Sequence, residues 1–141
     1  MMERQPIRVL IAEDHPIARL GLRSLLATWP MVEVVGEAVN GQEAVWAVGE
    51  CRPDVVLMDV RMPVLDGLQA TRLIKSKWPA VRVIVLTVNS QCRTEALAAS
   101  ADAFLIKGRP TNETLRAILG EEAPSQTPVP STGRAVRTSV D

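Results

Sequence analysis

Short apolar runs alternate along the chain with segments in which apolar residues recur at helical spacing. Several runs carry three or four consecutive apolar residues without alternation, which is typical of central parallel strands covered on both faces. Strands separated by helical segments predict βαβ units and a parallel sheet. The predicted strands are Ile7–Ala12, Val32–Glu37, Val55–Met58, Val81–Leu86 and Ala103–Ile106. We therefore predict an α/β domain with five strands and five helices that ends near Leu119.

Helix-breaking and helix-capping residues mark the boundaries of these segments. The stretches "TWP" at 28–30 and "KWP" at 77–79 are each expected to end a helix, because proline cannot continue one. Asn40, Asp66 and Thr111 stand where N-caps are expected, because their side chains can accept hydrogen bonds from free backbone N–H groups.

The last 21 residues, 121–141, differ in composition from the rest. They read "EEAPSQTPVPSTGRAVRTSVD", with three prolines, many Ser and Thr residues and no apolar periodicity. Such a segment buries too little apolar surface to offset the entropy lost on ordering. We expect a disordered tail or an interdomain linker there.

Composition and charge exclude several classes of protein. The 141 residues are 47% apolar and 23% charged, which is typical of a soluble globular protein. Sixteen Lys and Arg balance sixteen Asp and Glu, which argues against a nucleic-acid or membrane footprint. No apolar stretch approaches the roughly 20 residues of a membrane span, and the N-terminus does not resemble a signal peptide. Cys51 and Cys92 lack a CxxC spacing and are expected to be reduced thiols, so we predict a cytoplasmic location.

Polar residues follow four of the five predicted strands. Ligands of an open parallel sheet bind outside the carboxyl ends of its strands, so these side chains should share one site. Lone His15, beside Pro16, is interpreted as a loop residue without chemistry. The residues that follow the first, third, fourth and fifth strands are Glu13 and Asp14, Asp59, Thr87, and Lys107.

Three clustered carboxylates need compensating positive charge. Two like charges about 4 Å apart repel by about 4 kcal/mol at an effective dielectric constant of about 20. Mg²⁺ prefers oxygen ligands, and Glu13, Asp14 and Asp59 supply them, with the peptide carbonyl of Arg61 as a further candidate. The absence of a His or Cys cluster argues against zinc.

The same cluster predicts phosphoryl chemistry on Asp59. Aspartate carboxylates can form aspartyl-phosphates, and a phosphoryl group on Asp59 would need its charge neutralised. Mg²⁺ and Lys107 can each pair with a phosphoryl oxygen, and Thr87 can donate a hydrogen bond. Asp59, Thr87 and Lys107 are therefore the candidate residues for phosphoryl transfer.

At these residues the chain resembles the receiver domain of bacterial two-component response regulators, over residues 6–120. The motifs that carry the resemblance are "AEDHP", "LMDVRMPVLDG", "VIVLT" and "ADAFLIK". The "DHP" stretch, and Gly108 after Lys107 where most receivers have proline, resemble the NarL/LuxR-type subfamily. The resemblance implies a doubly wound, flavodoxin-like sheet in the order 2-1-3-4-5 with helices on both faces. It also implies a sensor histidine kinase that phosphorylates Asp59, and no enzymatic activity beyond Mg²⁺-dependent self-phosphorylation and autodephosphorylation.

The resemblance further implies a conformational switch. Thr87 would move toward the phosphoryl oxygen, Phe104 would turn inward, and the surface around the fourth helix, fifth strand and fifth helix would change. A homodimer that forms on phosphorylation is a further expectation. The chain departs from the family at Val88, which follows Thr87 where a small residue is favoured, and at Ser100, where many relatives have glycine. We expect Val88 to slow dephosphorylation or to restrict the choice of phosphodonor.

Several functions remain open on the sequence. The chain could be the regulatory part of a NarL/LuxR-type transcription regulator, with DNA bound only by a C-terminal domain outside these residues. It could also be a stand-alone receiver that acts by protein–protein interaction, or a pseudo-receiver that signals without phosphate. A Mg²⁺-dependent phosphatase is disfavoured, because we find neither a substrate pocket nor a general acid or base. The three tryptophans are expected mainly to pack, with Trp46 a candidate for an interaction face.

Overall fold

The computed structural model describes residues 5–88, 90–107 and 111–120. The chain divides into two compact units, residues 1–109 and 110–141, and each is described by itself. The described part of the second unit is helix α5 (Thr111–Leu119) and Gly120. The predicted tail, 121–141, lies outside the described residues, so its prediction and that of a single domain over 6–120 stay predictions.

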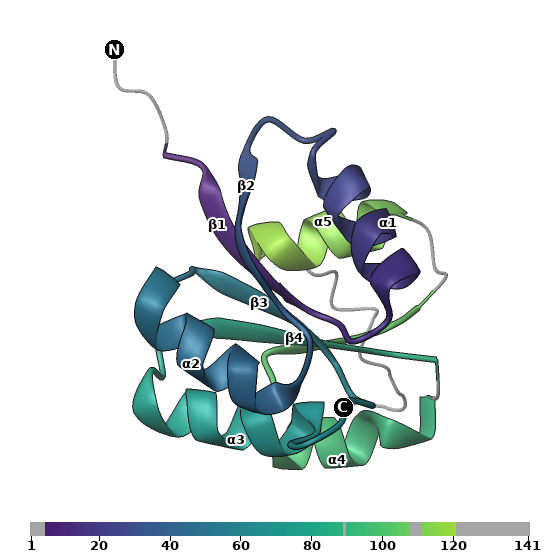
Figure 1. The fold of residues 1–141 in the computed structure, drawn as a ribbon. Coiled ribbons are helices and arrows are strands. Elements are labelled where there is room, and N and C mark those ends of the chain that lie inside the picture. The colour runs from purple at the N-terminus through teal and green to yellow at the C-terminus, as the bar shows by residue number, and fades with distance from the viewer. Residues whose placement is uncertain (1–4, 89, 108–110, 121–141) are drawn as a thin grey trace, which may run out of the picture. The chain divides into compact units, whose positions relative to one another are not determined.

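Five parallel strands form the sheet of the first unit, in the order β2-β1-β3-β4-β5 (Figure 1). This confirms the predicted fold class and strand order. Asp59 and Thr87 are the last residues of their strands, whereas the sequence placed them just beyond. The strands are β1 (Ile7–Ala12), β2 (Val32–Ala38), β3 (Val55–Asp59), β4 (Arg82–Thr87) and β5 (Ala103–Ile106).

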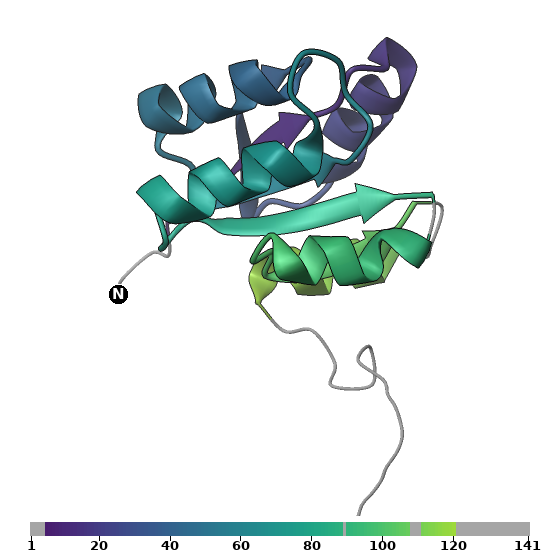
Figure 2. The same cartoon turned by 90° about the horizontal axis from the view of Figure 1, so that it is seen from below.

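Helices cover both faces of this sheet. The face opposite α1 is covered by α2, α3 and α4 (Figures 1 and 2). A short 3-10 helix, η1, precedes α4 and was not predicted. Among the described residues, no helix combines the length and apolar character that crossing a membrane requires. The helices are α1 (Pro16–Leu26), α2 (Gly41–Cys51), α3 (Gly67–Lys77), η1 (Ser90–Cys92) and α4 (Arg93–Ala98).

The core explains why the apolar run before Asp59 is continuous. All five residues of β3 are buried. Successive strand side chains point to opposite faces, so Val56 and Met58 pack with Ile74 beneath α2–α4 while Leu57 faces the α1 side. Full burial of each such side chain contributes about 1.5–3 kcal/mol, which fixes the strand and the acid at its end.

Two of the three predicted N-caps are confirmed. Asn40 caps α2, because its Oδ1 accepts a hydrogen bond from the Glu43 N–H at 2.8 Å. Asp66 caps α3 in a reciprocal capping box, with Gln69 N–H to Asp66 Oδ1 at 2.8 Å and Asp66 N–H to Gln69 Oε1 at 3.1 Å. Thr111 is instead the first residue of α5.

Gly67 holds the β3–α3 loop close to the strand that carries Asp59. Its N–H donates to the Val60 carbonyl at 2.8 Å. A Cβ on Gly67 would lie 1.9 Å from the Asp59 carbonyl oxygen, so only glycine permits this approach. The backbone at Asp59 is therefore fixed from the α3 side as well as by the sheet.

We expect Gly67→Ala to lower the free energy of unfolding by about 2 kcal/mol or more, because the new methyl collides with backbone. The control is Gly21→Ala within α1, where a Cβ meets nothing within 4 Å. There alanine should stabilise by about 0.5–1 kcal/mol through helix propensity. Urea unfolding followed by circular dichroism measures both values. Equal effects of the two substitutions would contradict the steric explanation.

Candidate functional site

The carboxyl ends of β1, β3, β4 and β5 meet at one cavity of about 350 Å³. The structure thus brings together six of the seven residues predicted for the site, and Phe104 does not line the cavity. Their placement agrees with the sequence, and the roles assigned to them stay predictions. The lining residues are Glu13, Asp14, His15, Ala18, Asp59, Arg61, Thr87, Val88 and Lys107.

Three carboxylates lie together in this cavity. Glu13, Asp14 and Asp59 each offer an oxygen, and these atoms lie within 4.8 Å of one another. Glu13 is only 1% exposed and Asp59 only 6%. Burial raises the pKa of Asp59, the charges of Glu13 and Asp14 raise it further, and Lys107 offsets part of the increase. A cluster of carboxylates that repel one another in a buried place is a donor set that fits Mg²⁺.

Lys107 is the basic partner of two of these acids. Its Nζ lies 2.8 Å from Glu13 Oε1 and 2.8 Å from Asp59 Oδ1. Burial alone would lower the pKa of Lys107, but the hydrogen bonds to Asp59 and Glu13 and the charges of these acids raise it overall. The backbone N–H of Lys107 also donates to the backbone carbonyl of Thr87 at 2.8 Å, which joins the ends of β4 and β5.

The remaining predicted residues differ in their surroundings. Thr87 is 3% exposed at the end of β4, whereas Val88 beside it is 73% exposed. Arg61 is exposed on the cavity wall. Phe104 is half-buried and packs against the core on the α2–α4 side. Val88 therefore stands at the mouth of the cavity, where it could affect access to Asp59.

Arg19 on α1 contacts the backbone of Glu13, one of the three acids of the cavity, and the sequence analysis did not predict this contact. Its Nη1 donates to the Glu13 carbonyl at 2.8 Å, and its Nε donates to Glu37 Oε1 at 3.0 Å. Arg23, one turn later, also pairs with Glu37. Two arginines four residues apart on a helix, with an acid at the end of the neighbouring strand, could have indicated the pairs with Glu37 but not the contact with the Glu13 carbonyl.

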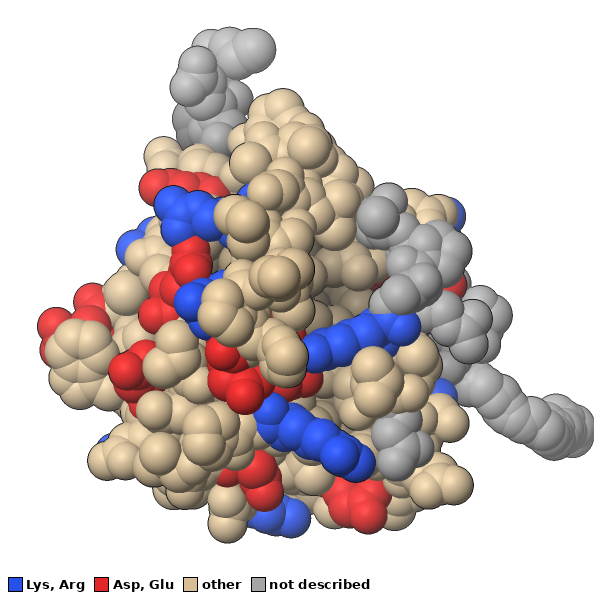
Figure 3. All heavy atoms as spheres, turned by 45° about the vertical axis from the view of Figure 1, so that its right-hand side comes forward, with Lys and Arg blue, Asp and Glu red and all other residues tan. Residues whose placement is uncertain are grey.

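Acidic and basic side chains are mixed on one face of the protein (Figure 3). Figure 3 shows acidic side chains gathered near the centre of one face, with elongated basic side chains directly beside them. No broad area of a single sign is visible on this face, which agrees with the zero net charge of the chain. The basic side chains on this face are therefore interspersed with acidic ones and form no extended basic patch of the kind that binds nucleic acids.

Comparison with known families decides the assignment. Residues 9–119 match the response regulator receiver domain. The chain belongs to this family. This receiver domain spans about half the length of the curated relatives it matches. One of them, the transcriptional regulatory protein LnrK of Bacillus subtilis, is 40% identical over 115 residues, which are 80% of this chain and 52% of LnrK.

Solved structures show the same fold. The signal receiver domain of the putative response regulator NarL from Mycobacterium tuberculosis is 33% identical with a TM-score of 0.78, covering 83% of this chain and 96% of that one. The receiver domain of sensor histidine kinase PA1611 from Pseudomonas aeruginosa PAO1 is 30% identical, with a TM-score of 0.73 and coverages of 82% and 96%. A magnesium ion is coordinated in the active site cleft of PA1611. Relatives of this receiver domain thus include regulators of the predicted NarL/LuxR type.

The raised pKa of Asp59 predicts that its ionised form destabilises the metal-free fold. A folded-state pKa above the unfolded value favours the protonated state, so this penalty appears as pH rises from the ordinary range of Asp through the raised pKa. At neutral pH without divalent cations, Asp59→Asn should therefore raise the free energy of unfolding, by about 1 kcal/mol. Below the ordinary pKa of Asp the difference should vanish. Urea unfolding at several pH values measures it.

Asp66→Asn is the matched control for this experiment. It also replaces a carboxylate with an amide, but at an N-cap outside the cavity where Asn caps as well as Asp. Its stability should stay close to that of the wild type. A loss of stability in Asp59→Asn at neutral pH would contradict the electrostatic interpretation.

Proposed function

We propose that Asp59 accepts a phosphoryl group from a sensor histidine kinase and that phosphorylation switches an output surface of this receiver domain. One observation carries the proposal: buried Asp59 lies among two further acids and 2.8 Å from the ammonium of Lys107. Lys107 can neutralise part of the charge of an added phosphoryl group, and a cation held by the three acids would neutralise more. Receiver domains of response regulators interact with histidine kinases, which supports the choice of donor.

Glu13, Asp14, Asp59 and the Arg61 carbonyl would hold the Mg²⁺ that this function implies. When bound, Mg²⁺ would relieve the repulsion among the acids and neutralise charge on the transferred group. The magnesium ion in PA1611, a relative with the same fold, supports this assignment.

The residues of this chain would then perform the transfer in a defined way. A carboxylate oxygen of Asp59 attacks phosphorus, the P–N bond of a phosphohistidine breaks, and its electron pair leaves with the imidazole. Lys107 pairs with a phosphoryl oxygen in place of Asp59 Oδ1, and the Thr87 hydroxyl donates to another. These residues thus contribute to the transfer by positioning the phosphoryl group and by compensating its charge. Val88 at the cavity mouth would slow the entry of water and so the loss of the phosphoryl group.

The output we propose is regulation of transcription. The chain would be the regulatory part, residues 6–120, of a cytoplasmic NarL/LuxR-type regulator, with 121–141 as the linker to a C-terminal DNA-binding domain. Support comes from LnrK, a transcriptional regulatory protein about twice as long as the matched region. Thr87 and Phe104 would form the switch, and phosphorylation would favour a homodimer. A stand-alone receiver and a phosphate-independent pseudo-receiver are the alternatives that experiment must separate.

Incubation with acetyl phosphate and Mg²⁺ should add one phosphoryl group to the wild type, because Lys107 and the Mg²⁺ would compensate the charge that the phosphoryl group brings to Asp59. Intact-protein mass spectrometry measures the adduct. Asp59→Asn should show none, and Asp66→Asn should be labelled like the wild type. If neither acetyl phosphate nor beryllofluoride modifies or binds the wild type, the pseudo-receiver becomes the better description.

The same mass measurement, followed over time after removal of the donor, tests Val88. Val88→Ala should lose the phosphoryl group several-fold faster, because a smaller side chain admits water. Met31→Ala, an exposed hydrophobic residue that does not line the cavity, should match the wild type.

The contact from Arg19 to the Glu13 carbonyl predicts that Arg19 positions the metal ligands. Arg19→Ala should weaken Mg²⁺ binding about tenfold, the lower end of the effect expected for residues that orient ligands. Arg23→Ala is the matched control, because Arg23 lies on the same helix as Arg19 and its side chain also pairs with Glu37. Isothermal titration calorimetry measures both affinities, and Arg19→Lys should restore part of the loss. Equal weakening by both alanine variants would instead indicate a general loss of α1 packing.

A further inference from the structure

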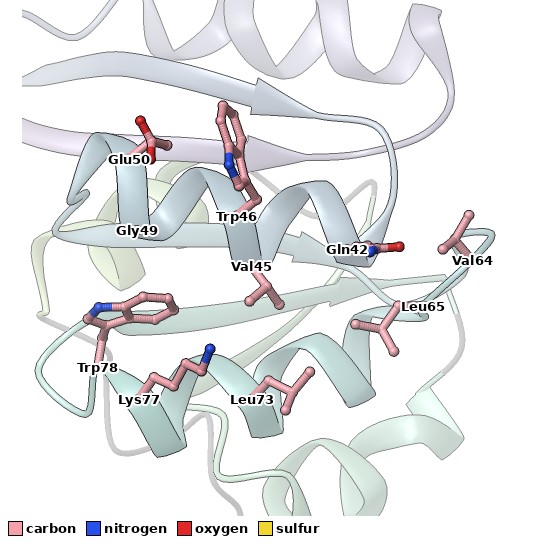
Figure 4. Close-up of a pocket in the computed structure, with 10 residues that line it drawn as sticks. All are labelled: Gln42, Val45, Trp46, Gly49, Glu50, Val64, Leu65, Leu73, Lys77 and Trp78. Atoms are coloured by element: carbon pink, nitrogen blue, oxygen red, sulfur yellow. The ribbon is translucent and has the colours of Figure 1, made fainter.

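A groove between α2 and α3 stands apart from the phosphoryl site. It has a volume of about 630 Å³ and shares no lining residue with the acidic cavity. Helix α2 forms one wall of the groove and helix α3 forms the other (Figure 4). The lining residues are Gln42, Val45, Trp46, Gly49, Glu50, Val64, Leu65, Leu73, Lys77 and Trp78.

The floor of the groove is fixed by the core. Val45, Leu65 and Trp78 are partly buried and pack against the core cluster beneath α2–α4. Trp78 also lies against α2, because a Cβ on Gly49 would be 3.3 Å from its indole ring. A floor held in this way presents a preformed apolar surface.

The rim exposes large apolar side chains. Trp46 is 67% exposed, Val64 is 74% exposed and Leu73 is 43% exposed. Indole rings supply large contact areas at protein interfaces at low entropic cost, and an exposed apolar patch rimmed by polar groups is typical of an interaction site. The sequence had already singled out Trp46 as a candidate for such a face.

The two charged residues that line the groove have opposite sign, with Glu50 on the α2 wall and Lys77 on the α3 wall. Helix α2 contains Glu43 and Glu50 and no basic residue. Helix α3 contains Arg72, Lys75 and Lys77 and no acidic residue. Glu50 and Lys77 both lie at the end of the groove where Trp78 stands, and Gln42 and Leu65 lie at the other end (Figure 4). The charges are thus separated across the groove and matched along it.

We propose that a second copy of this chain covers the groove, in a dimer whose two-fold axis runs along it. Rotation about that axis places α2 of each copy on α3 of the other and preserves position along the groove. Glu50 then faces Lys77 of the second copy, twice in the dimer, and Trp46 reaches the wall that carries Leu73. A two-fold axis across the groove would instead oppose α2 with α2, acid against acid.

Charge reversal tests this pairing with two variants. Glu50→Lys alone and Lys77→Glu alone should each be monomeric at concentrations where the wild type dimerises, because each places like charges together. An equimolar mixture of the two should form a heterodimer, since both pairings across its interface become Lys with Glu. Sedimentation velocity on the full chain without phosphodonor measures all three samples.

Two further variants separate the groove from the rest of the surface. Trp46→Ala should weaken dimerisation at least about tenfold, as expected for an aromatic anchor at an interface. Because the Trp46 side chain is exposed, its truncation should leave the fold of the monomer intact. Glu33→Lys makes the same charge change on β2 outside the groove and should dimerise like the wild type. The proposal is overturned if the wild type stays monomeric at protein concentrations up to about 1 mM. A dimer that is not detected at that concentration has a binding free energy weaker than about 4 kcal/mol. Failure of the mixed variants to associate overturns the proposal as well, and leaves the groove to another kind of partner.

Discussion

The repulsion among Glu13, Asp14 and Asp59 is the constraint on which the phosphoryl site depends. Each acid sits at the end of a strand whose apolar residues are buried on both faces, so the acids cannot move apart without loss of core packing. Lys107 offsets part of the repulsion through two contacts of 2.8 Å, yet the pKa of Asp59 remains raised. The fold thus holds the acids in an arrangement that favours added positive charge.

The same core packing explains how much of this site the sequence predicts. Apolar runs without alternation identify buried parallel strands, and parallel strands bring their carboxyl ends to one edge. Once Glu13, Asp59, Thr87 and Lys107 are seen to follow such runs, their convergence requires no knowledge of side-chain contacts. Asp59 and Thr87 proved to be the last strand residues, a shift of one position that leaves the site unchanged.

Arg19 shows what the sequence pattern cannot supply. Its contact is to a main-chain carbonyl, so no complementary residue type in the sequence marks the partner. Phe104 illustrates a different limit, because the presence of an aromatic residue after the fourth helix does not show which way its ring faces. Here it packs against the core and stays away from the cavity lining. The helix η1 before α4 was missed because three residues carry no periodicity.

Net charge conceals the feature that distinguishes the groove. A total of zero argues against polyanion binding, yet it does not show that helices of opposite sign lie side by side in this chain, α2 acidic and α3 basic. Segregation of this kind attracts the two helices within one molecule and equally attracts a second molecule rotated about the groove. Because the groove and the acidic cavity share no lining residues, contact at the groove leaves Asp59 open to a phosphodonor. Self-association at α2–α3 and phosphorylation at the strand ends can therefore occur together on one chain.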